Sequence, residues 1–148
     1  MKILSKQFIA DAIKIRHHLH QIPELKYEEK QTSAFISEIL KSYGYEIQEG
    51  VGGTGVVALL DSGNSGKTIA FRADIDALPI TESTGVAYQS KHQGIMHACG
   101  HDGHTATLLL VSRMLQQIKS QLRGKIKLIF QPAEEGGKGS SAMIQDGV

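Results

Sequence analysis

Hydrophobic residues in the first third of the chain recur at the spacing of two amphipathic helices. The first is predicted from Ser5, a suitable N-cap, to about His20, with Phe8, Ile9, Ala12, Ile13 and Leu19 near helical spacing. Pro23 then interrupts the pattern, because proline does not continue a helix. A second helix is predicted over residues 29–43, and Gly44 follows where a left-handed residue commonly ends a helix.

The middle of the chain changes to short runs of β-branched and apolar residues, which predict strands. These runs cover residues 45–49, 55–61 and 67–73, and the Gly- and Ser-rich segment 62–66 predicts a hairpin between the last two. A helical pattern returns over residues 103–122, and residues 125–131 alternate as a strand. This order of elements predicts an α/β fold with a mixed sheet flanked by helices.

Composition narrows the class of protein. The 148 residues suffice for one domain with an apolar core, and their formal net charge is +1. We expect no nucleic-acid partner, because no basic stripe with interleaved aromatics is present. The longest apolar run, residues 56–60, is far shorter than the ~20 residues of a membrane helix, so we expect no membrane partner. One cysteine and no secretory signal predict a cytoplasmic protein.

Metal-ligating side chains are concentrated in residues 97–105. This segment holds the only cysteine, Cys99, and three of the seven histidines. Cys99 and His101 form a plausible ligand pair for Zn or a neighbouring ion, since alternate residues of an extended loop can face one point. Taken singly, each is more often a buried thiol or a satisfied histidine. The chain has no second pair of Cys or His ligands at the distance that a zinc finger requires. The glycines at 100 and 103 disfavour a zincin-type helix, so we expect a metal site in a loop.

Two pairs of carboxylates follow predicted strands. Asp74 and Asp76 share one side of an extended segment and can orient ligands, although Asp74 also suits a strand end and Asp76 an Asx turn. Glu134 and Glu135 stand in a tight loop, where one can bind metal while its neighbour faces a substrate; such a pair is otherwise a common solvated feature. Sites in open α/β sheets gather at the carboxyl ends of strands, so these groups are expected to converge with the cysteine-histidine cluster.

Such a site supports metal-assisted hydrolysis. A metal lowers the pKa of its bound water, and Glu134 is placed to take the proton as general base and to pass it to a leaving amine. Asp76 and Asp102 are candidates for carboxylates that fix the tautomers of histidine ligands.

Three segments together resemble a known family. They are residues 72–79 (RADIDALP), 97–105 (HACGHDGHT) and 130–136 (FQPAEEG), and residues 16–25 are similar to the family's amino-terminal signature. They resemble the aminoacylase and carboxypeptidase-like superfamily of metallopeptidases, in the branch of hippurate hydrolase, N-acyl-amino-acid amidohydrolase and auxin-conjugate hydrolase. The resemblance implies a small-molecule N-acyl amino acid as substrate and two divalent metal ions, commonly Mn or Zn, with Co or Ni also suited to such ligands.

By this resemblance, Cys99, His101 and Glu135 match metal ligands and Glu134 matches the catalytic base. Members of the family are more than twice as long, carry two further ligand histidines and a smaller dimerisation or lid domain, and form homo-oligomers. We therefore expect residues 1–148 to be the amino-terminal part of an incomplete catalytic domain. This chain alone is expected to bind metal weakly and to show little turnover.

Two other hypotheses remain open. Cys99 can be a nucleophile activated by His101 or His104, as in thiol hydrolases, although that leaves Glu134 and Glu135 without a task. Alternatively, the chain is a truncated non-catalytic remnant or a binding module.

Overall fold

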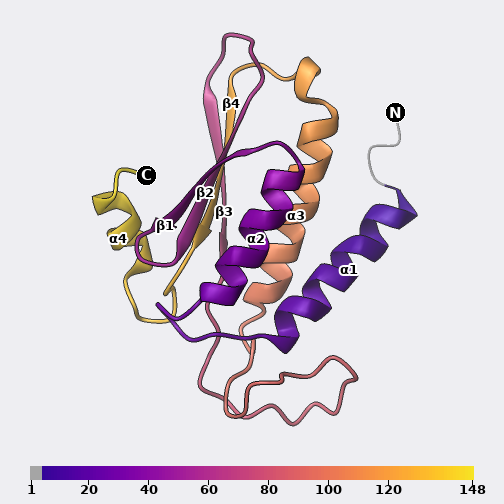
Figure 1. The fold of residues 1–148 in the computed structure, drawn as a ribbon, viewed down its shortest axis with the longest axis vertical. Coiled ribbons are helices and arrows are strands. Elements are labelled where there is room, and N and C mark those ends of the chain that lie inside the picture. The colour runs from indigo at the N-terminus through magenta and orange to yellow at the C-terminus, as the bar shows by residue number, and fades with distance from the viewer. Residues whose placement is uncertain (1–4) are drawn as a thin grey trace.

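The computed structural model describes residues 5–148, and its first two helices confirm the predicted pair (Figure 1). α1 spans Lys6–Gln21, and the side chain of its N-cap, Ser5, accepts a hydrogen bond from the Phe8 N–H at 3.2 Å. α2 spans Lys30–Ser42. Gly44 has a φ of +79°, and its N–H donates to the Lys41 carbonyl. The second helix therefore ends where the glycine predicts.

Four strands form one mixed sheet in the order β1-β2-β4-β3. They are β1 (Glu46–Val51), β2 (Gly55–Asp61), β3 (Thr68–Asp74) and β4 (Lys125–Gln131). β2 pairs antiparallel with both β1 and β4, whereas β3 pairs parallel with β4. The prediction of an α/β fold with a mixed sheet is confirmed.

The predicted hairpin between the second and third strands is wrong. β4 lies between β2 and β3, so these two consecutive strands are not neighbours. The Ser62 N–H donates to the Gly124 carbonyl, and the Gly124 N–H donates to the Asn64 carbonyl, so the turn pairs with the segment that leads into β4. β2 is buried along most of its length and takes a central place, which requires a strand on each side.

Helices cover both faces of the sheet unequally (Figure 1). α2 and α3 (His101–Gln117) pack on one face, and α1 packs against α3. That face carries the main core, which includes Leu40, Leu109, Leu128 and Phe130. A smaller cluster on the other face joins Val57 to Met143 of α4 (Gly139–Gln145). A short 3₁₀ helix, Lys119–Gln121, follows α3.

The long connection between β3 and α3 is anchored at both of its ends. Leu25 bridges to Ala77, and Leu78 and Met96 exchange two backbone hydrogen bonds of 3.0 Å. These pairings place the segment before α3 beside the carboxyl end of β3. Within residues 5–148, no helix combines the length and apolarity needed to cross a membrane.

Candidate metal centre

Side chains from two separate segments meet beyond the carboxyl ends of β3 and β4. Cys99 lies in the loop before α3, His101 is the first residue of that helix, and Glu135 follows β4. One ligand atom from each of these residues lies within 4.8 Å of the other two. The predicted trio is therefore brought together, and its thiol, imidazole and carboxylate form a donor set that suits a divalent transition metal.

The cluster is not a pure loop site, which corrects the sequence expectation. Cys99 and Glu135 lie in loops, whereas His101 does not, because α3 already begins at His101. Gly100 precedes the helix with a φ of +87°, a conformation that glycine adopts without steric cost. This left-handed residue turns the chain sharply between Cys99 and His101, and the helix then fixes the histidine backbone.

Asp76 holds the imidazole of His101 in one orientation. The Nδ1–H donates to the Asp76 carbonyl oxygen at 2.9 Å, and Asp76 Oδ1 lies 3.2 Å from the same nitrogen as an ion-pair contact. Asp76 Oδ2 accepts a hydrogen bond from the Glu135 N–H at 2.9 Å. With Nδ1 occupied, Nε2 is the nitrogen left for a metal, so Asp76 orders two residues of the trio at once.

Asp76 and His101 shift each other's pKa toward their charged forms. The Asp76 carboxylate beside Nδ1 raises the pKa of His101 to about 8 against the opposing effect of burial. Burial alone would raise the pKa of Asp76, but hydrogen bonds from His101 and from the Glu135 and Glu134 backbone outweigh it and lower that pKa. Asp76 is thus held as an anion next to an imidazole that is more basic than a free histidine side chain.

Glu134 lies on the open side of the cluster. Its Oε2 is 3.8 Å from His101 Nε2, and its side chain is 41% exposed. Glu134 and Glu135 therefore both approach the cluster, one reachable from solvent and one closer to Cys99. The two neighbouring carboxylates therefore differ in their exposure to solvent.

A buried carboxylate that sequence reasoning missed secures this loop. Glu29 is fully buried, and its Oε1 accepts a hydrogen bond from the Ala133 N–H at 2.9 Å while Oε2 accepts one from the Thr54 hydroxyl. Ala133, next to Glu134, has a φ of +51°, which is unusual for a residue with a side chain. The start of α2 thus supports the strained loop that carries Glu134 and Glu135.

The thiol of Cys99 is exposed and lies in an acidic environment. A hydrogen bond with Glu135, partial desolvation and nearby carboxylates raise its pKa. A nucleophilic cysteine needs the opposite shift, which is normally produced by a neighbouring positive charge. A divalent cation is a group that would convert this thiol into a thiolate.

Asp102 does not fix a histidine of the cluster, although the sequence suggested that role. Its Oδ2 lies 2.7 Å from Nδ1 of His20 in α1 and 2.9 Å from Nε of Arg16. This buried contact ties α1 to the start of α3. The role of Asp102 is therefore to link two helices, and only Asp76 orients a histidine of the trio.

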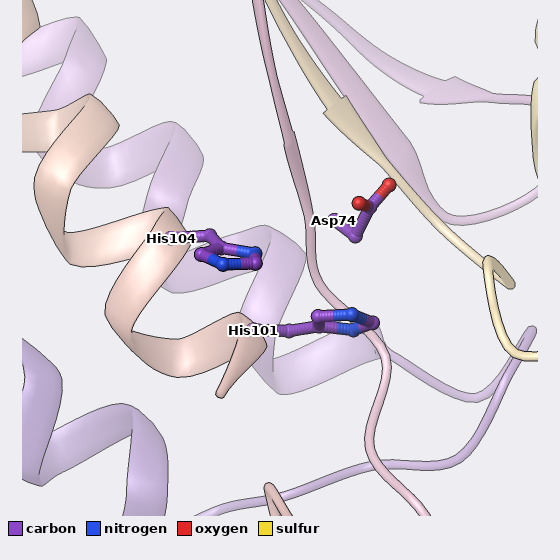
Figure 2. A group of neighbouring side chains, drawn as sticks. All are labelled: Asp74, His101 and His104. Atoms are coloured by element: carbon purple, nitrogen blue, oxygen red, sulfur yellow. The ribbon is translucent and has the colours of Figure 1, made fainter. Parts of the chain in front are cut away.

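A second group of potential ligands shares His101. It consists of Asp74, His101 and His104, whose ligand atoms also lie within 4.8 Å of one another. Figure 2 shows both histidines projecting from the start of α3 toward the end of the strand that carries Asp74. Arg72 already donates to Asp74 Oδ1 at 2.9 and 2.5 Å, which makes the first trio the better candidate. The three-residue spacing of the two histidines on a helix is the signal that predicts their proximity.

His97 is a buried histidine whose ring forms no hydrogen bond within the described part of the chain. It is 4% exposed, and neither ring nitrogen has a hydrogen-bond partner. Burial lowers its pKa to about 4, so the ring is neutral at pH 7. A neutral ring presents one N–H donor and one acceptor nitrogen.

Comparisons with known proteins show what the chain is similar to. The family model for peptidase family M20/M25/M40 matches residues 70–148. N-acetyl-L-cysteine deacetylase of Bacillus subtilis is 52% identical over 147 residues, which cover 99% of this chain and 34% of that protein. Hippurate hydrolase of Campylobacter jejuni is 50% identical over 135 residues, which cover 91% of this chain and 35% of that protein.

A solved structure extends the similarity to three dimensions. The Bacillus subtilis YXEP protein, described as a dinuclear metal binding peptidase from the M20 family, matches with a TM-score of 0.92 at 41% identity. The match covers 97% of this chain and 40% of that chain. The chain therefore spans about a third of the length of the curated relatives it matches.

Proposed function

Because the chain belongs to peptidase family M20/M25/M40, we propose that it forms the metal-holding part of an amidohydrolase that cleaves the amide bond of N-acyl amino acids. The observation that carries the proposal is the grouping of Cys99, His101 and Glu135 beside the exposed Glu134 carboxylate. The names of two relatives, a deacetylase and a hippurate hydrolase, support a small N-acylated substrate.

The three grouped residues would hold a divalent metal ion. Zn and Mn are the first candidates, and Co or Ni also accept thiolate, imidazole and carboxylate ligands. We propose a two-ion centre in the whole protein, which the description of the YXEP structure supports. When bound, the ions supply Lewis acidity that polarises the amide carbonyl and makes water a better nucleophile.

Glu134 would act as the general base and then as the general acid. Its carboxylate accepts a proton from the attacking water as the oxygen bonds to the amide carbon. The protonated carboxyl then donates that proton to the amine nitrogen as the C–N bond breaks. The products are a carboxylic acid and a free amino acid, and Glu134 returns to the ionised state in which it began.

Asp76 would be a positioning residue, because it contacts His101 and the Glu135 backbone. By holding Nδ1 it keeps Nε2 free for the metal, and by accepting from Glu135 N–H it fixes the second ligand. A free thiol among the ligands also favours a reducing compartment, and we place the protein in the cytoplasm on that ground.

The raised pKa of Cys99 opposes the alternative in which this residue is the nucleophile. Chelation separates the two mechanisms, since a thiol hydrolase would keep its activity in EDTA. For residues 1–148 alone we predict weak metal binding and little turnover, because three protein ligands are few for two ions. A non-catalytic binding module would instead fold cooperatively without any response to metal.

The test uses the whole protein that the gene encodes. Hippurate is the substrate, and the release of glycine is measured. Glu134→Gln should lower kcat by roughly 10²–10⁴ while metal content stays constant. Glu38→Gln, an identical change at an exposed site on α2, serves as the control. Activity that survives chelation, or a Glu134→Gln variant as active as the control, would contradict the proposal.

A further inference from the structure

Residues 24–29, which connect α1 to α2, contact the loop that carries Glu134 and Glu135 (Figure 1). Three side chains of this connection form hydrogen bonds with the backbone of that loop. The pairs are Glu29 with the Ala133 N–H at 2.9 Å, Lys26 with the Glu135 carbonyl at 3.2 Å, and Tyr27 with the Gly137 carbonyl at 2.5 Å. These contacts fall on every second residue of the loop, so the backbone is held on both sides of Glu134.

The Glu134 side chain has no comparable anchor of its own. It is 41% exposed, and its one ion-pair contact among the described residues is with His101 Nε2, at 3.8 Å. A general base must lie within about 3 Å of the atom whose proton it removes, and small errors of placement lower the rate strongly. The position of this carboxylate is therefore set mainly by the backbone on either side of it.

The backbone is strained on both sides of this contact. In the described part of the chain, the residues other than glycine with a positive φ are Tyr27 at +64°, Ala133 at +51° and Lys138 at +59°. All of them belong to this contact, because Ala133 and Lys138 bracket the loop and Tyr27 bonds to it. Such conformations are sparsely populated and persist only where the surrounding structure holds them. The loop is thus held in a position that it would not adopt alone.

Glu29 is the residue of the connection that is best placed to hold the loop. Both Glu29 and Ala133 are fully buried, so water does not compete for their hydrogen bond. The other carboxylate oxygen accepts from the Thr54 hydroxyl, which fixes the orientation of the group. Lys26 and Tyr27 are exposed, and their hydrogen bonds are open to competition from water.

We propose that the α1–α2 connection positions the Glu134 carboxylate for proton transfer, and that Glu29 is the positioning residue through which it acts. This role rests on the proposed function, in which Glu134 is the general base. Glu29 acts through the backbone N–H of Ala133 and has no contact with the reacting atoms. Its effect on the reaction therefore depends on the reach of its side chain and not on its charge.

The test compares two variants of Glu29 in the whole, metal-loaded protein with hippurate as substrate. Glu29→Gln keeps the length of the side chain and an acceptor for the Ala133 N–H. Glu29→Asp keeps the charge but withdraws the acceptor by one methylene group. Glu29→Asp should lower kcat about tenfold or more, since a misplacement of about 1 Å can cost about 100-fold, whereas Glu29→Gln should stay within about threefold of the unmodified protein. KM and metal content should change less than about twofold in both variants.

Amide hydrogen exchange of the metal-free protein gives a second measurement that does not depend on activity. Glu29→Asp should speed the exchange of residues 133–137 about tenfold, and Glu29→Gln should speed it by less than about threefold. Glu24→Asp is the matched control, because Glu24 is the other buried carboxylate of the connection and accepts its side-chain hydrogen bonds from Gln31 and Thr32 of α2. This control should leave kcat and the exchange of the loop within about twofold.

A larger loss of kcat in Glu29→Gln than in Glu29→Asp would overturn the proposal, because charge and not position would then decide the rate. Equal behaviour of Glu29→Asp and Glu24→Asp in kcat or in exchange would also overturn it, as would a loss of metal content in place of kcat. Failure of the proposed function would look different. Even the unmodified protein would then release no glycine from hippurate, yet the exchange of residues 133–137 would still separate Glu29→Asp from Glu24→Asp.

Discussion

Removal of the Glu29 carboxylate should destabilise the loop that carries Glu134 and Glu135. Glu29 is fully buried and accepts hydrogen bonds from the Ala133 N–H at 2.9 Å and from the Thr54 hydroxyl. Hydrogen bonds to a charged group contribute about 1.5–3 kcal/mol each. Glu29→Ala removes two of them and leaves the Ala133 N–H buried without a partner. We expect a loss of roughly 3–5 kcal/mol in the free energy of unfolding.

The measurement is urea unfolding followed by circular dichroism, because the chain contains no tryptophan. A loss of this size lowers Tm by roughly 6–20 °C for a chain of this length. Glu29→Gln keeps the shape and one acceptor, so it should cost only about 1–2 kcal/mol and should fold even if the alanine variant does not.

Glu28→Ala is the matched control, since Glu28 is exposed and immediately precedes Glu29. It should change the free energy of unfolding by less than about 0.5 kcal/mol. If Glu29→Ala costs no more than this control, the buried carboxylate does not support the loop.

Two further predictions concern the metal trio and its surroundings. Asp76→Ala should weaken divalent metal binding about 10- to 100-fold in calorimetric titration, because His101 loses its orienting carboxylate. Asp61→Ala, at an exposed position, should leave the affinity unchanged. Equal affinities in the two variants would refute the role of Asp76. Acidification should destabilise the fold through His97, whose pKa is lowered from 6.5 to about 4. The unfolded chain takes up this proton first, so stability is lost as the pH falls from about 6.5 to about 4, by about 3 kcal/mol at most. His97→Gln should remove that part of the pH dependence in urea unfolding, and an unchanged slope would contradict it.

Local sequence signals predicted the helices and strands well. Ser5 and Gly44 mark helix ends through caps that depend on a few neighbouring residues, and both behave as expected. The run 125–131 was predicted as a strand from its alternation, and β4 occupies it. Such features are visible in sequence because their causes lie within a few positions of one another.

Strand pairing was predicted less well because its causes are not local. The Gly- and Ser-rich turn at residues 62–66 suits a hairpin, yet β4, more than fifty residues later, pairs with β2 instead. The helix start at His101 was also missed, since two glycines argued against a helix there. Gly100 lies outside the helix as its left-handed N-cap and therefore causes no penalty within it.

The sequence predicted the residues of the candidate site but not the buried residues around them. Cys99, His101 and Glu135 meet as expected because each follows or precedes a strand or helix end at the same edge of the sheet. Glu29 and His97 gave no comparable signal. A buried glutamate that accepts from a loop more than a hundred residues away, and a histidine without a partner, are recognised only from tertiary contacts.

The central claim is that Cys99, His101 and Glu135 bind one divalent ion together. The most direct measurement is a titration of the chain with Co²⁺ under reducing conditions, followed by the thiolate-to-cobalt charge-transfer absorption. The claim predicts a saturable band that is absent in Cys99→Ser and that requires higher cobalt concentrations in His101→Ala and Glu135→Ala. A chain that shows no such band, or a band that neither the His101 nor the Glu135 variant weakens, would contradict it.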